Sequence, residues 1–157
     1  KINLGVVIIN NAAVRLEGTS AHYAPLNFPA VASLKLTNAL NDAAAALNVP
    51  HHVGISVSSD TFWPGQERYD SFTGYVCNAL RGTLKEWQAL GALNYEMETA
   101  ALFVVAQAFG LNAASICGVI AKRTQSESIA PPEIYALASE RFGAVAKKAL
   151  QTLLKGE

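Results

Sequence analysis

The sequence predicts an α/β protein in which helices pack on a mostly parallel central sheet. Two observations indicate this fold class: short β-branched runs alternate with segments of helical spacing, and no repeat or low-complexity linker interrupts the alternation. The chain has 157 residues, of which 51% are hydrophobic, so it has the size of one compact domain and can bury most of its apolar surface. We therefore expect a single α/β domain over residues 1–157.

The expected strands are β-branched or alternating segments bounded by glycine, proline or polar loops. They cover residues 4–16, 51–59, about 92–97 and 113–121. The first of these forms either one long strand or two consecutive ones, and Gly18 ends it. A polar loop with two prolines follows over residues 18–30 and contains His22, which we expect to be a surface hydrogen-bonding group rather than a ligand contact.

The expected helices carry apolar residues near helical spacing and are bounded by proline or glycine. They cover residues 31–49, 83–91, about 98–109 and about 132–154. We expect Trp87 and Leu90 to be buried in the second helix, while Pro131 and Pro132 open the last one. The stretch 71–82 is ambiguous.

Composition and charge argue against several classes of partner and site. The formal net charge is 0, with 12 basic and 12 acidic residues interspersed, so neither a nucleic acid nor an anionic membrane is expected to bind. No segment reaches about 18 uninterrupted apolar residues and no signal-peptide pattern occurs, which predicts a cytoplasmic protein. Cys77 and Cys117 are expected to be buried, reduced thiols. His51 and His52 are adjacent in a strand and point to opposite faces, so no metal site is predicted.

The stretch SSDTFWPGQERYD, residues 58–70, follows a predicted strand and carries the first candidate site. Pro64 and Gly65 predict an extended turn, and we expect it to present Gln66 and Arg68 outward on the same side. An amide with both a donor and an acceptor beside a guanidinium is suited to reading the polar edge of a planar heterocycle. A flat, heterocyclic ligand is therefore indicated.

Two further segments carry charged side chains close to strand ends. NYEMETA, residues 94–100, places Glu96 and Glu98 where a strand gives way to a helix, and their carboxylates can accept hydrogen bonds from sugar hydroxyls or support the helix start. GVIAKRTQ, residues 118–125, puts Arg123 just beyond another strand. Arginines that converged with an amide would give a strong donor set for carbonyl oxygens, whereas the alternative for each arginine is an ion pair at the surface or between subunits.

SSDTFWPGQERYD, LKEWQALGALNYEMETA and GVIAKRTQ, in this order, resemble the uridine phosphorylases of the nucleoside phosphorylase superfamily. The resemblance runs from about Ile2 to the C-terminal helix and covers only the later part of such an enzyme. It implies a nucleoside phosphorylase-like, three-layer α/β sandwich with a mixed, mostly parallel central sheet, with the N-terminal portion missing. The expected domain is then the C-terminal portion of a larger phosphorylase domain.

The activity implied by the resemblance is phosphorolysis of uridine to uracil and ribose 1-phosphate. Gln66 would contact the uracil 2-carbonyl and N3, while Arg68 and Arg123 would face the 4-carbonyl and stabilise the departing base. Phe62 would stack on the base or line its pocket, and Glu98 would accept hydrogen bonds from the ribose 2′ and 3′ hydroxyls. The other implied contacts, which surround the sugar or form an apolar wall with a closing lid, are Tyr95, Glu96, Met97, Ile120, Ala121 and Ile129.

Inorganic phosphate is the implied co-substrate, without a metal or an organic cofactor, and the implied assembly is a homo-oligomer with shared active sites. No glycine-rich loop with an arginine and threonine cluster that could hold phosphate occurs in the 157 residues. A non-catalytic nucleoside-binding module or structural subunit is therefore an alternative, as is a phosphorylase or hydrolase for another nucleoside. Purine-specific relatives carry an acidic residue near the position of Arg123, and an arginine there favours a pyrimidine. Lys122 departs from the neutral amide that is commoner in the family.

Overall fold

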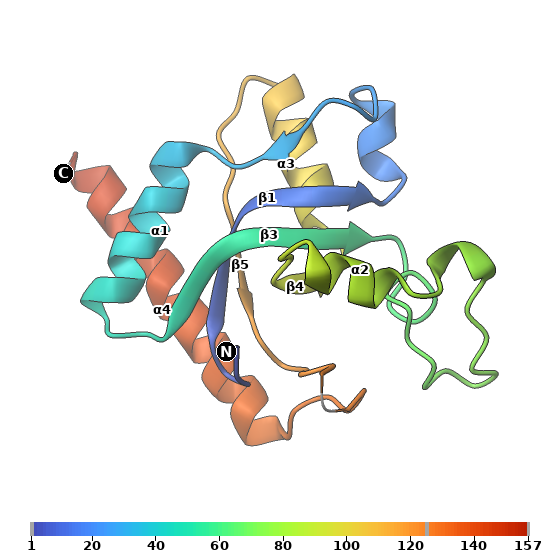
Figure 1. Ribbon diagram of the computed structural model, residues 1–157. Coiled ribbons are helices and arrows are strands. Elements are labelled where there is room, and N and C mark those ends of the chain that lie inside the picture. The colour runs from blue at the N-terminus through green and yellow to red at the C-terminus, as the bar shows by residue number, and fades with distance from the viewer. Residues whose placement is uncertain (1, 125, 157) are drawn as a thin grey trace. The chain divides into compact units, whose positions relative to one another are not determined.

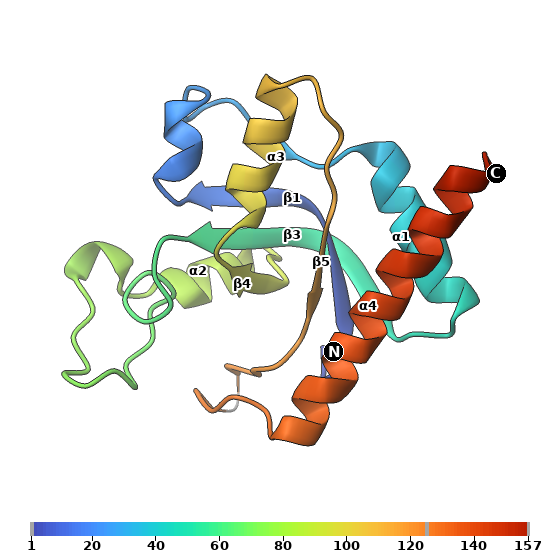
Figure 2. The same ribbon diagram turned by 180° about the vertical axis from the view of Figure 1, so that it is seen from behind.

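The computed structural model describes residues 2–124 and 126–156, so Gln125 of the GVIAKRTQ motif lies outside the described residues. These residues form an α/β fold with a mixed sheet and four α-helices, in agreement with the fold class predicted from the sequence. The sheet order is β2-β1-β3-β4, and β5 pairs with β1. The elements, shown in Figures 1 and 2, are β1 (Val7–Leu16), the 3-10 helix η1 (Thr19–His22), β2 (Ala30–Val31), α1 (Leu34–Ala46), β3 (His51–Ser59), the 3-10 helix η2 (Asn78–Leu80), α2 (Thr83–Ala89), β4 (Asn94–Glu96), α3 (Thr99–Ala108), β5 (Ser115–Gly118) and α4 (Pro132–Lys155).

Residue contacts divide the described chain into two compact units. Unit 1 comprises Lys1–Asn11, Ala32–Gly54 and Ala114–Glu157, and unit 2 comprises Ala12–Val31 and Ile55–Ala113. The strands β1 and β3 each begin in unit 1 and end in unit 2. The single domain expected over residues 1–157 stays a prediction.

Unit 1 is built on the packing of α1 and α4, which lie side by side in both views (Figures 1 and 2). The start of β1 pairs antiparallel with β5, with Val7 opposite Gly118 and Asn10 opposite Ser115. A Cβ added at Gly118 would lie 2.8 Å from the Cβ of Ala138, so the glycine allows α4 to approach β5 closely. The buried core comprises Val7, Ile9, Leu40, Ala43, Ala44, Val145 and Ala149.

Unit 2 contains the strand pair that positions the candidate site. Here β3 and β4 run parallel, with Ser56 opposite Asn94 and Ser58 opposite Glu96. The end of β1 pairs antiparallel with β2, which in turn contacts α3. Phe103 of α3 has no exposed surface, as expected for an apolar helix packed on a sheet. Because β3 and β4 are parallel neighbours, the segments that follow them leave the same edge of the sheet.

The structure corrects the expected burial of Leu90, which is 67% exposed. The cause is that α2 ends at Ala89, and Gly91, with a φ of 82°, turns the chain so that the Ala92 N–H donates to the Trp87 carbonyl at 2.9 Å. In the described part of the chain, no helix combines the length and the apolar character that crossing a membrane requires.

Candidate functional site

The loop that follows β3 contains a tight turn closed by its own hydrogen bonds. The Gly65 N–H donates to Thr61 Oγ1 at 2.7 Å, and the Arg68 N–H donates to the Trp63 carbonyl at 2.7 Å. A Cβ added at Gly65 would lie 2.7 Å from Thr61 Oγ1 and 2.8 Å from the Thr61 carbonyl oxygen. A glycine at this position therefore lets the turn fold back on Thr61, and a larger residue would force it open.

Gln66 and Arg68 are buried, with exposed fractions of 5% and 1%. The expectation of an extended turn that presents both side chains outward is wrong, because the turn folds back on itself. The Arg68 Cζ atom lies 4.3 Å from the centroid of the Phe62 ring, a cation–π contact, and its Nε lies 3.4 Å from Asp70 Oδ1. These contacts hold the guanidinium in a defined orientation.

Glu67, between these two residues, joins the turn to the start of α2. Its Oε1 accepts hydrogen bonds from the Gly82 N–H at 2.6 Å and the Tyr69 hydroxyl at 3.1 Å. Its Oε2 accepts from the Leu84 N–H at 2.7 Å and the Thr83 hydroxyl at 3.4 Å. Burial raises the pKa of Glu67, but hydrogen bonds led by those from Leu84 and Gly82 outweigh it and hold the pKa below its ordinary value. Partial burial and the bond to Glu67 raise the pKa of Tyr69.

The resemblance assigns Glu67 no role, and the sequence carries no signal for this contact. Three of the four described donors to the Glu67 carboxylate come from residues 82–84, fifteen or more positions further along the chain, in or next to the stretch whose structure the sequence leaves ambiguous.

Glu96 joins the end of β4 to β3 and to the first turn of α3. Its Oε1 accepts hydrogen bonds from the hydroxyls of Ser56, at 3.0 Å, and Ser58. Its Oε2 accepts from the backbone N–H groups of Glu98, at 2.8 Å, and Thr99, at 2.6 Å. Both oxygens are thus used within the fold, and Glu96 supports the start of α3, as one interpretation of NYEMETA predicts. Its contact with a substrate stays a prediction.

Glu98 differs from Glu96 because its carboxylate is exposed. The hydrogen bond described for that carboxylate comes from the N–H of Met97, at 3.2 Å. Met97 is half-buried, as is Tyr95, which lies opposite Val57 in the parallel pair. Since β3 and β4 are parallel, the segment that contains Glu98 and the loop that contains Gln66 both leave the same edge of unit 2.

The segment after β5, in unit 1, forms a second loop. Ala121 and Ile129 form an antiparallel bridge, and the Ala130 N–H donates to the Ile120 carbonyl at 2.6 Å. Ile120 and Ala121 are half-buried, whereas Ile129 is 53% exposed. The roles of these residues as an apolar wall and a lid stay predictions.

Arg123 lies inside this bridged loop and forms a bidentate ion pair. Its Nε and Nη2 donate to the two carboxylate oxygens of Glu127 at 2.8 and 3.0 Å. The alternative of an ion pair is therefore present, although both partners belong to one loop and the Arg123 side chain is only 9% exposed. Convergence of Arg123 with Gln66 and Arg68 on one base stays a prediction. Lys122, next to it, donates to Asn3 Oδ1 at 3.0 Å.

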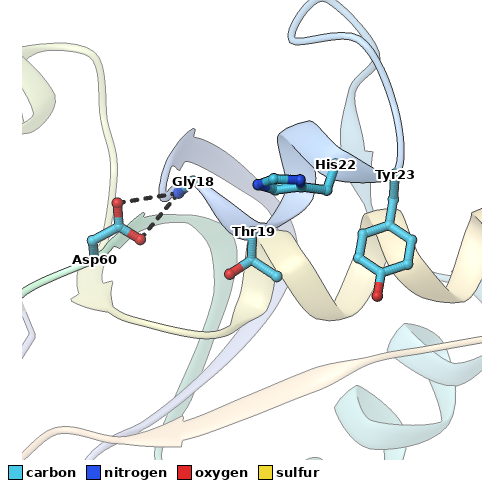
Figure 3. A pocket seen from close by; sticks show the side chains of 5 residues that line it. All are labelled: Gly18, Thr19, His22, Tyr23 and Asp60. Carbon is cyan, nitrogen blue, oxygen red and sulfur yellow. Dashed lines mark hydrogen bonds between the residues drawn. The ribbon is translucent and has the colours of Figure 1, made fainter.

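A shallow depression in unit 2 is lined by Gly18, Thr19, His22, Tyr23 and Asp60 (Figure 3). The Gly18 N–H donates to both oxygens of the Asp60 carboxylate, at 3.0 and 3.1 Å. His22 is exposed, and the sequence favours the same surface position. Among residues 2–124 and 126–156, no group of three or more His, Cys, Asp or Glu side chains is arranged to hold a metal ion.

Comparison with known proteins places these residues in a family context. The profile of the "Phosphorylase superfamily" matches residues 1–151. The uridine phosphorylase of Escherichia coli (strain K12) is 51% identical over 126 residues, which are 80% of this chain and 50% of that protein. That of Thermococcus kodakarensis is 42% identical over 126 residues, 80% of this chain and 45% of that protein. The guanosine phosphorylase of Halorubrum lacusprofundi is 30% identical over 118 residues, 75% of this chain and 43% of that protein. The chain spans about half the length of the curated relatives it matches.

Proposed function

We propose that this chain, which belongs to the phosphorylase superfamily, forms the nucleoside-binding part of a uridine phosphorylase. The proposed reaction converts uridine and inorganic phosphate to uracil and ribose 1-phosphate. The observation that carries the proposal is the common origin of two segments at one edge of the β3–β4 pair: one bears the buried donors Gln66 and Arg68, and the other bears the exposed carboxylate of Glu98. Similarity to proteins named uridine phosphorylase supports uridine as the substrate.

The base is the proposed ligand of Gln66 and Arg68. The amide of Gln66 can pair with the uracil 2-carbonyl and N3, and the guanidinium of Arg68 can donate toward the 4-carbonyl. As the glycosidic bond breaks, the uracil ring takes the electron pair of that bond, and negative charge develops on its carbonyl oxygens. Fixed donors favour this transition state over the neutral substrate, and loss of one such donor typically costs about 3 kcal/mol of barrier.

The sugar is the proposed ligand of Glu98, whose carboxylate can accept hydrogen bonds from the 2′ and 3′ hydroxyls while Met97 lies against the ring. With the ribose held in this way, a phosphate oxygen bonds to its anomeric carbon from the face opposite the base as the bond to uracil breaks. The electron pair goes to N1 of the base, which takes up the proton that hydrogen phosphate loses. No oxidation occurs, so the step needs no redox cofactor, and we propose that it proceeds without a metal.

The remaining roles are proposed from the shared motifs. Arg123 would add a donor toward the 4-carbonyl, Ile120 and Ala121 would form an apolar wall, and Ile129 would act as a lid. Phe62 would line the base pocket, and its contact with the Arg68 guanidinium gives it a second role in orienting that donor. We also propose a homo-oligomer with shared active sites and a cytoplasmic role in pyrimidine salvage, and sedimentation analysis tests the oligomer.

The experiment that tests the reaction is measurement of uracil released from uridine, with and without inorganic phosphate. Release that requires phosphate supports the proposal. Equal release in phosphate-free buffer points instead to a hydrolase of the same fold. Calorimetric binding of uridine without any release supports the second candidate, a non-catalytic nucleoside-binding module.

The preference for a pyrimidine needs its own measurement, because one relative of this chain is named guanosine phosphorylase. Guanosine competition against uridine binding tests it. The edge of uracil has a carbonyl on each side of N3–H, whereas guanine has one carbonyl and an amino group, so two sets of donors from Gln66 and Arg68 should favour uridine. Tighter binding of guanosine contradicts the proposed base.

A further inference from the structure

Glu67 occupies the position between the two proposed base-binding residues, and its backbone is in an unusual conformation. Its φ is 53°, in the left-handed region, which a residue with a Cβ adopts at a cost and keeps only when other contacts hold it. Gln66 and Arg68 lie on either side of this residue in the chain. Any relaxation of Glu67 toward an ordinary φ would therefore redirect one neighbour relative to the other.

The Glu67 N–H donates to the Pro64 carbonyl within the turn at 3.0 Å, and its carboxylate makes the described contacts that reach beyond the turn. The Gly82 and Leu84 N–H groups donate at 2.6 and 2.7 Å, distances typical of strong hydrogen bonds to a charged acceptor. The Tyr69 hydroxyl donates at 3.1 Å, so the side chain also bonds across Arg68 to the residue beyond it. The carboxylate thus links both sides of the turn to the start of α2.

From these contacts we propose that Glu67 is a positioning residue, which fixes the orientation of Gln66 and Arg68 by fastening the backbone between them to residues 82–84. The identity of the ligand in this inference rests on the proposed function, whereas the positioning itself rests on the contacts within unit 2. Glu67 is not expected to touch the nucleoside, since its described partners belong to the turn and to α2 and its exposed fraction is 8%.

The substitution Glu67→Gln tests this role because it removes the charge and one acceptor while it keeps the size of the side chain. The glutamine amide has only one oxygen, so its NH₂ group must face either the Gly82 N–H or the Leu84 N–H. That backbone N–H then faces another donor and loses its acceptor. Tyr69→Phe is a milder second variant that removes only the hydroxyl. The matched control is Glu86→Gln, the same chemical change at an exposed position of α2.

The readouts are hydrogen exchange of the free protein and calorimetric titration with uracil and with uridine. For Glu67→Gln we expect faster exchange confined to residues 61–70 and 80–86, and about tenfold weaker binding of both ligands, which is the size expected when hydrogen-bond geometry is lost. We expect the same loss of affinity for both ligands, because uracil lacks the sugar and Gln66 and Arg68 are proposed to bind only the base. Tyr69→Phe should give the same pattern with a smaller effect, and Glu86→Gln should match the unaltered chain.

Three results overturn the inference: unchanged exchange in the turn, unchanged uracil binding, or faster exchange that extends to the β1–β5 pair in unit 1. The last would mean that Glu67 only adds general stability. If the unaltered chain binds neither uracil nor uridine, the proposed function fails while exchange still decides the positioning. Faster hydrogen exchange confined to the turn and the start of α2 in Glu67→Gln then supports the positioning role, and an unchanged exchange pattern overturns it.

Discussion

At the scale of single residues, Glu67 and Arg68 carry opposite charges on adjacent positions, yet their described partners differ. The guanidinium lies on the Phe62 ring and near Asp70, whereas the carboxylate accepts hydrogen bonds from the start of α2. Buried charges are costly unless each has its own partners. Here the guanidinium and the carboxylate are each stabilised by a different set of neighbours. The turn can therefore hold the buried guanidinium that we propose as a donor to the base.

The first prediction concerns the pH dependence of stability. Hydrogen bonds hold the folded-state pKa of Glu67 below its ordinary value of 4.5, so the folded protein binds this proton less tightly than the unfolded chain. The stabilisation is fully present above the ordinary pKa and is lost as the pH falls through the folded pKa. Glu67→Gln should therefore lower the free energy of unfolding by about 2 kcal/mol at pH 7. Urea titrations should show the difference shrinking between pH 5 and pH 3, and an equal difference at every pH contradicts this account.

The second prediction concerns the base donor Gln66. Gln66→Ala removes an amide that is proposed to pair with the base, so uridine should bind at least about tenfold more weakly. Calorimetry measures the change, and Gln88→Ala, an exposed glutamine on α2, serves as the control with unaltered affinity. Equal affinities for Gln66→Ala and the unaltered chain would remove Gln66 from the site.

The candidate residues could be named from the sequence, but their environment could not. Pro64 and Gly65 predict a turn, and the motifs single out Gln66 and Arg68, because turn chemistry and motif order are local properties. The burial of both side chains and the contacts of Glu67 depend on residues distant in the chain, which no local pattern reports. The outward orientation expected for the turn failed for this reason.

At the scale of elements, the parallel pair β3–β4 and the helix α3 form one connected support. Ser58 donates a hydrogen bond to Glu96, and its hydroxyl oxygen accepts the Ala100 N–H at 2.8 Å. Glu96 in turn accepts the Thr99 N–H at 2.6 Å. The end of β3, the end of β4 and the first turn of α3 are thereby joined next to the exposed Glu98, which directly precedes α3.

The third prediction separates the two glutamates of this support. Glu96→Ala leaves two backbone donors and two hydroxyls without their acceptor, so the free energy of unfolding should fall by about 2 kcal/mol or more. Glu98→Ala should change stability by less than about 0.5 kcal/mol, as is usual at the surface, but should weaken uridine binding. Urea unfolding and calorimetry on both variants give the comparison, and similar destabilisation by both changes would refute it.

The fourth prediction concerns the turn itself. Gly65→Ala places a methyl group within 2.8 Å of Thr61 atoms, so the turn must shift, with a cost of about 2 kcal/mol. Gly143→Ala is the control, because no heavy atom lies within 4 Å of the added Cβ, and alanine at that α4 position should be neutral or stabilising by up to about 1 kcal/mol. Thermal unfolding followed by circular dichroism measures both, and equal stabilities would show that the turn can do without a glycine at this position.

The pattern of elements was more predictable from sequence than their pairing. Hydrophobic periodicity located β3 at residues 51–59 and α4 within a residue or two, since both depend on residues near in the chain. The antiparallel pairing of β1 with both β2 and β5 joins distant segments, and the two-residue β2 is too short for a periodic signal.

At the scale of the whole molecule, two compact units carry different parts of the proposed site residues. Unit 2 contains Gln66, Arg68 and Glu98, and unit 1 contains Arg123. With a formal net charge of 0, the chain has no strong overall attraction for anions, so recognition of a nucleoside must come from particular donors and acceptors. The central claim is therefore local: the segments that follow β3 and β4 bind the nucleoside.

The most direct test of this claim is a titration of the isotopically labelled chain with uridine, followed by amide NMR shifts. The account predicts saturable changes concentrated in residues 61–69 and 95–100, the segments that carry Gln66 and Glu98. Shifts confined to the depression lined by Gly18, His22 and Asp60, or the absence of any saturable change at residues 61–69, would contradict it.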